Sequence, residues 1–101
     1  MLRVLAEARG EAIEAAAWYD HEKRGLGDQL LDEIELALAR IDNNPQGFPL
    51  WEFTCGSHDV RRCVLKRFPY VVLFTVRADE TTVVAISHGR RRPTYWRDRL
   101  G

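Results

Sequence analysis

The chain has 101 residues, of which 46% are hydrophobic and 30% charged, a balance typical of a folded domain and not of a disordered segment. This length suffices for one domain and is too short for two, so we expect a single domain over residues 1–101. No apolar run approaches the roughly 18 residues of a membrane-spanning helix, and the N-terminus lacks an export signal, so the sequence predicts a cytoplasmic protein without a membrane partner.

Acidic and basic residues cancel in number, but they are unevenly distributed. Residues 1–50 contain five Lys/Arg and ten Asp/Glu, whereas residues 51–101 contain ten Lys/Arg and five Asp/Glu. The folded chain could therefore present one acidic and one basic face, and its neutral total says little about its partners.

The first half of the chain predicts a short strand and two helices. Residues 2–5 are apolar and suit an opening strand, and residues 8–23 are strong helix formers. Glycines in residues 25–27 allow the chain to turn back. A second helix is expected over residues 28–42, where apolar side chains form one stripe, and Asn43-Asn44-Pro45 ends it. The two helices are expected to form an antiparallel hairpin.

The second half predicts a sheet. Residues 45–59 are rich in proline, glycine and aromatic residues, and we expect an irregular, mobile connection there. Three strands follow over residues 60–65, 70–77 and 81–87, dominated by β-branched and aromatic residues. Short connections make them antiparallel neighbours, so the fold class is α+β, a helical hairpin on one face of a small antiparallel sheet, with a short helical turn at the C-terminus.

The strand periodicity separates two faces of this sheet. The bulkier set, which we assign to the core beneath the helices, comprises Tyr70, Val72, Phe74, Val76, Cys63 and Leu65. The opposite face, expected to be partly open, carries Val71, Leu73, Thr75, Arg62, Val64 and Lys66.

The segment from Ser87 to Arg99 is the most unusual part of the chain, because five of its thirteen residues are arginine and aromatic residues lie among them. It must face an anionic partner, take part in catalysis, or be neutralised by the chain's own acids, and we expect the last option least.

The candidate target-binding residues are Arg61, Arg62, Lys66, Arg67, Arg92 and Trp96. If their strands are neighbours, the cations would converge on one rim that grips phosphate, and Tyr95 and Trp96 could stack on bases. The alternative is that these arginines pair with the acidic helices or are solvated.

The candidate catalytic residues are His88, Arg90, Arg91 and Tyr95. A neutral imidazole beside arginines could take a proton from a ribose 2′-hydroxyl while the guanidinium groups stabilise the charge that develops on phosphorus. The alternative is that His88 only packs or donates a hydrogen bond. His21, His58, Cys55 and Cys63 lack metal-ligand spacing, so neither a metal nor a cofactor is expected, and the two cysteines are expected to be reduced.

Several short motifs together resemble the RelE/ParE superfamily of toxins from bacterial type II toxin–antitoxin modules, over residues 4–99. They are Ala15-x2-Trp18-Tyr19, Gly25-Leu26-Gly27, Pro45-x2-Phe48-Pro49, Arg61-Arg62, Arg67-Phe68-Pro69-Tyr70 and His88-x-Arg90-Arg91-x-Pro93-x-Tyr95-Trp96. The resemblance implies an α+β domain held inactive by a protein antitoxin. It also implies one of two targets, since members either cleave mRNA on the ribosome or inhibit DNA gyrase.

The resemblance also implies residue roles. Arg62 matches a cation on a strand, Arg90 or Arg91 matches the arginine after the last strand, and Tyr95 matches the late tyrosine. Val64 and Val71 stand where the ribonuclease branch carries basic residues, and His88 could compensate for them. The main expectation is metal-independent mRNA cleavage. The alternatives are inhibition of gyrase without catalysis, or a degenerate toxin with neither activity.

Overall fold

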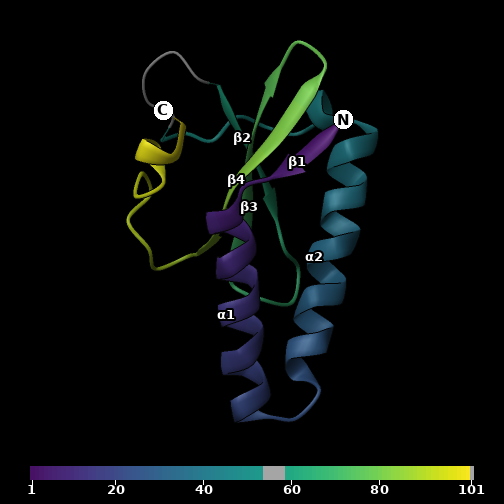
Figure 1. Cartoon of the computed structure of the whole chain (residues 1–101), viewed down its shortest axis with the longest axis vertical. Coiled ribbons are helices and arrows are strands. Elements are labelled where there is room, and N and C mark those ends of the chain that lie inside the picture. The colour runs from purple at the N-terminus through teal and green to yellow at the C-terminus, as the bar shows by residue number, and fades with distance from the viewer. Residues whose placement is uncertain (54–58, 101) are drawn as a thin grey trace.

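The computed structural model describes residues 1–53 and 59–100, which form one mixed sheet with two helices on one side (Figure 1). In chain order the elements are β1 (Leu2–Val4), α1 (Ala6–Glu22), α2 (Leu26–Asn43), a 3-10 turn (Pro45–Gly47), β2 (Val60–Val64), β3 (Tyr70–Arg77), β4 (Glu80–His88) and a second 3-10 turn (Arg97–Leu100). The predicted α+β class and helical hairpin are confirmed. Residues 54–58, within the predicted irregular connection, lie outside the described residues.

The helical hairpin closes around two glycines. Gly25 adopts a left-handed conformation with φ of 89°, which a residue without Cβ tolerates, and α2 begins directly after it at Leu26. The helix therefore starts two residues earlier than predicted, because Gly25 alone makes the turn. A Cβ on Gly27 would lie 2.2 Å from the carbonyl oxygen of Ala16, so only glycine fits where α2 crosses α1.

The sheet order is β1-β4-β3-β2. The antiparallel pairs β2–β3 and β3–β4 are those predicted. The predicted small antiparallel sheet comprises these three strands, and β1, for which no pairing was predicted, runs parallel to β4, with Leu2 opposite Thr81. A parallel pair needs a long crossover connection, and here the helices and the other strands supply it.

The face of the sheet toward the helices, here called the helix face, has the predicted core. Cys63, Leu65, Val72 and Phe74 pack in one buried cluster with apolar residues of α2, including Leu30. The residues that α1 contributes to this cluster are small, namely Ala8, Ala12 and Ala15. Cys63 carries a free, buried thiol whose pKa is raised by burial, whereas Cys55 lies outside the described residues.

The opposite face, here called the tail face, is more covered than predicted. Residues 89–100, the C-terminal tail, return across it, and Trp96 is completely buried there with Leu73 and Val84. Val71, Leu73 and Thr75, expected on a partly open face, are all buried. This part of the face is covered because the tail supplies apolar side chains that pack on it.

No helix in the described part of the chain is long and apolar enough to cross a membrane.

Candidate functional site

The C-terminal tail is held on the sheet by its aromatic residues. The indole N–H groups of Trp51 and Trp96 both donate to the carbonyl oxygen of Pro93, at 3.1 Å and 2.7 Å. At the start of the tail, the backbone N–H of Gly89 donates to the carbonyl oxygen of Pro69 at 2.8 Å. Trp96 was predicted to contact a target; in this structure its ring is completely buried against the sheet.

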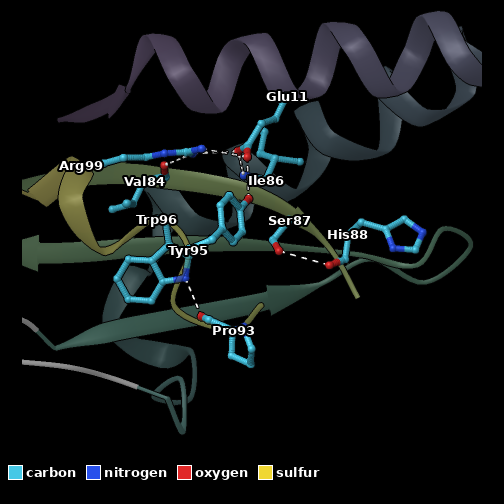
Figure 2. Close-up of polar contacts among 9 residues, drawn as sticks. All are labelled: Glu11, Val84, Ile86, Ser87, His88, Pro93, Tyr95, Trp96 and Arg99. Atoms are coloured by element: carbon cyan, nitrogen blue, oxygen red, sulfur yellow. Dashed lines mark hydrogen bonds and ion pairs between the residues drawn. The ribbon is translucent and has the colours of Figure 1, made fainter. Parts of the chain in front are cut away.

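Glu11 of α1 is the centre of the polar contacts between the tail and the rest of the domain (Figure 2). Its carboxylate accepts the backbone N–H of Ile86 at 2.9 Å, the hydroxyl of Tyr95 at 2.5 Å and the guanidinium of Arg99 at 2.9 Å and 3.0 Å. Arg99 also donates to the carbonyl oxygen of Val84 at 3.1 Å. Arg99 is therefore neutralised by an acid of its own chain, which was the option expected least.

These contacts close an edge of the sheet. β1 pairs with β4 only as far as Val83, and beyond that point β4 has no neighbouring strand on this side. The N–H of Ile86 and the C=O of Val84 point to this edge and bind Glu11 and Arg99 instead of a strand. Unpaired strand edges can pair with other chains. Here the side chains of Glu11 and Arg99 bind the edge groups that a further strand would otherwise bind. Sequence reasoning missed Glu11, although it lies on the same helical face as Ala8 and Ala15.

Tyr95, a candidate catalytic residue, is constrained by these contacts. Burial and the hydrogen bond to Glu11 raise its pKa to about 12. The guanidinium groups of Arg91 and Arg99 lie 3.9 Å and 5.0 Å from the centre of its ring. Its hydroxyl is therefore neutral at physiological pH, and its proton is donated to Glu11.

His88 lies at the end of β4 on the helix face. Its ring packs edge-to-face on Tyr70 at 5.1 Å between centroids, and its Nδ1 accepts the backbone N–H of Arg90 at 3.0 Å. The imidazole borders a hollow whose other walls include Glu14 and Trp18 of α1. Figure 2 shows the imidazole pointing away from Tyr95, so these two candidate catalytic residues do not face one reacting centre.

The basic residues of β2 point to opposite faces of the sheet. Arg61 is paired in register with Phe74 of the helix face, and its guanidinium donates to the carbonyl oxygen of Phe48 at 2.6 Å. Arg62 is opposite Leu73 of the tail face and donates to the carbonyl oxygen of Leu50 at 3.1 Å. β3 separates β2 from β4, so Arg62 and the arginines after β4 are not carried by adjacent strands.

The turn after β2 is tied to α2 by Glu33. Its carboxylate accepts the backbone N–H groups of Lys66 and Arg67 at 2.5 Å and 3.3 Å and pairs with the Arg67 guanidinium at 3.5 Å. Burial raises the pKa of Glu33, but the two backbone hydrogen bonds and Arg67 outweigh it, so the pKa lies below its ordinary value. Arg67 is thus paired within the chain, whereas the Lys66 side chain is exposed.

The cations that follow β4 are exposed. Arg90, Arg91 and Arg92 all lie at the surface, and Arg91 stacks on Tyr95. Within the described residues, the side chains of Arg90 and Arg92 make no hydrogen bond or ion pair. In the same part of the chain, no cluster of His, Cys, Asp and Glu side chains could hold a metal ion.

The family model described as "ParE toxin of type II toxin-antitoxin system, parDE" matches residues 2–93. The chain belongs to the ParE toxin family. This assignment confirms the resemblance to the RelE/ParE superfamily and makes the chain the toxin of a ParDE type II toxin–antitoxin system. The matched residues end at Pro93, so the part of the tail that holds Tyr95, Trp96 and Arg99 lies beyond the match.

The fold of this ParE family member is also found among solved structures. It is similar to a chain of the "Chromosomal ParDE TA system from P. aeruginosa", with a TM-score of 0.75, 18% sequence identity, and coverage of 86% of this chain and 92% of that chain. At this identity the likeness concerns the fold alone. No curated protein matches the chain.

Proposed function

We propose that this ParE-family toxin arrests growth by binding DNA gyrase and does not itself catalyse a reaction. The observation that carries the proposal is the state of Tyr95. Its hydroxyl is donated to Glu11, and its pKa is raised to about 12. The hydroxyl that a catalytic tyrosine would offer to a substrate is therefore bound to an acid of the same chain.

The surroundings of the other candidate catalytic groups agree with this proposal. His88 points away from Tyr95, and Val64 and Val71 offer no charge to a phosphate. Membership of the ParE family, as distinct from the ribonuclease branch of the superfamily, adds to the support. Cleavage of mRNA on the ribosome, with His88, Arg90 and Arg91 as catalytic residues, is the competing function. Both targets place the action of the toxin in the cytoplasm.

The second partner we propose is a cognate antitoxin, whose presence is implied by the ParDE system. Arg90 and Arg92 are exposed, and acidic residues of an antitoxin would complement them. A short reading frame beside this one, encoding an acidic and apolar segment, is the expected source.

The test measures both activities on the same variants. Purified toxin is titrated into a gyrase supercoiling assay, and mRNA ends are mapped by primer extension after induction in cells. We expect the natural chain to inhibit supercoiling by gyrase without producing new mRNA ends. The His88→Ala variant should inhibit supercoiling as fully as the natural chain. New mRNA ends that disappear in His88→Ala, without inhibition of gyrase, would overturn the proposal in favour of the ribonuclease.

A further inference from the structure

The C-terminal tail covers the tail face unequally. Trp96 packs over the part formed by Leu73, Val84 and Ala85. Toward the turn between β2 and β3 the tail leaves a hollow of about 360 Å³, here called the arginine-rimmed hollow. Its walls include Trp51, Arg62, Val64, Val71 and Gly89.

The floor of the arginine-rimmed hollow is apolar. Val64 and Val71 are direct cross-strand partners on the tail face. Val71 is buried, but Val64 is 62% exposed, one of the most exposed large apolar side chains in the described part of the chain. The hollow is also lined by apolar atoms of Leu65 and Phe68. An apolar side chain placed on this floor would remove Val64 from water, which is favourable by about 25 cal/mol for each Å² buried.

The rim of the hollow is positive. Arg62 lies on one side and donates to only one carbonyl oxygen, that of Leu50, so other N–H groups of its guanidinium remain available. Gly89 lies on the other side, and Arg62 is the charged residue that lines the hollow among the described residues. Neither Asp nor Glu lines the hollow among the described residues. A partner that fits must therefore bring an apolar group and negative charge together.

We propose that the arginine-rimmed hollow docks the target protein through an apolar side chain that sits on Val64, next to a carboxylate that pairs with Arg62. This inference rests on the proposed function, in which the target is a protein. A nucleic acid would use the arginines through its phosphates but would gain little from a valine floor, because the floor offers no hydrogen-bonding group to a base edge. An apolar centre with a charged rim is instead the usual composition of a protein interface.

The test compares matched substitutions in the full-length toxin. Val64→Lys places a charge on the floor. Leu36→Lys makes the same kind of change on α2, where Leu36 is 67% exposed and lies outside the hollow. Arg62→Glu reverses the charge on the rim. Urea unfolding checks that each variant is folded, and binding to the cognate antitoxin is measured in parallel.

We expect Val64→Lys and Arg62→Glu each to weaken inhibition of gyrase by at least about tenfold, the effect of one interface hot spot. Leu36→Lys should inhibit like the natural chain, and antitoxin affinity should change less than about twofold in all three variants.

The outcomes separate the two proposals. If the natural chain does not inhibit gyrase, the proposed function fails and the inference fails with it. If the natural chain inhibits and folded Val64→Lys and Arg62→Glu inhibit equally well, only the inference is overturned. It is also overturned if these two variants lose antitoxin binding but retain inhibition, because the hollow would then serve the antitoxin.

Discussion

The two faces of the sheet are closed by different means. On the helix face, α1 contributes small alanines and α2 larger apolar residues, so the buried surface is shared among many side chains. On the tail face, a short irregular segment closes the sheet through one large ring, Trp96, and through side-chain hydrogen bonds to Glu11 and Pro93. Stability on the tail face is therefore concentrated in a few residues, and single substitutions there should have unusually large effects.

The strongest test of this difference is Trp96→Ala. Removing a completely buried tryptophan is expected to cost about 3–5 kcal/mol of the free energy of unfolding, because it leaves a large cavity between the tail and the sheet. Trp18→Ala is the control, since Trp18 is 59% exposed, and it should cost less than about 1 kcal/mol. Urea unfolding followed by circular dichroism measures both. Equal losses for the two variants would mean that the tail does not depend on Trp96.

The second test concerns the carboxylate that holds the tail. Glu11→Gln should lower the free energy of unfolding by about 1–3 kcal/mol, because the charge-assisted hydrogen bonds to Arg99 and Tyr95 are weakened. Glu14→Gln changes an exposed acid of the same helix and should lie within about 0.5 kcal/mol of the natural chain. If Glu11 acts through Arg99, adding Arg99→Gln to the Glu11→Gln variant should lower the free energy of unfolding only a little further. Full additivity would contradict the pairing.

The third test uses the ionisation of Tyr95. An unfolded tyrosine ionises near pH 10, whereas the folded state keeps Tyr95 neutral up to about 12. The contribution of Tyr95 to stability is therefore complete below about pH 10 and is lost as the pH rises toward 12. Phenolate absorbance, recorded with circular dichroism to detect unfolding, should show a late phase that is missing in Tyr95→Phe. If the phenolate absorbance of all tyrosines rose in a single phase near pH 10 while the protein stayed folded, this assignment would be contradicted.

The smallest effect is expected for Glu33, which ties the turn after β2 to α2. Since its pKa is lowered in the folded state, its contribution to stability is present above its ordinary pKa of 4.5 and is lost as the pH falls. Glu33→Gln should cost about 1 kcal/mol at neutral pH and flatten the acid side of the stability profile. Unfolding measured at several acidic pH values tests this expectation. A profile as steep as that of the natural chain would assign the acid sensitivity to other carboxylates.

The sequence predicts one side of this comparison better than the other, for a physical reason. The apolar stripe of α2 and the alternation in β3 are local patterns, so the helix face could be assigned residue by residue. The docking of the tail depends on contacts such as that of Arg99 with Glu11, which are 88 residues apart in the sequence. No helix or strand periodicity connects residues so far apart, so the sequence predicts a free surface for this arginine-rich, aromatic segment. The parallel position of β1 was missed for the same reason, because only the fold brings Leu2 beside Thr81.

The edge of β4 beyond Val83 bears on how the toxin behaves at high concentration. A strand edge closed by another strand stays closed unless the sheet unfolds, but this edge is closed by Glu11 and Arg99, whose side chains can rotate away without disturbing the backbone. Loss of the Glu11–Arg99 pair would therefore leave the N–H of Ile86 and the C=O of Val84 without these partners, at an edge where another strand could pair.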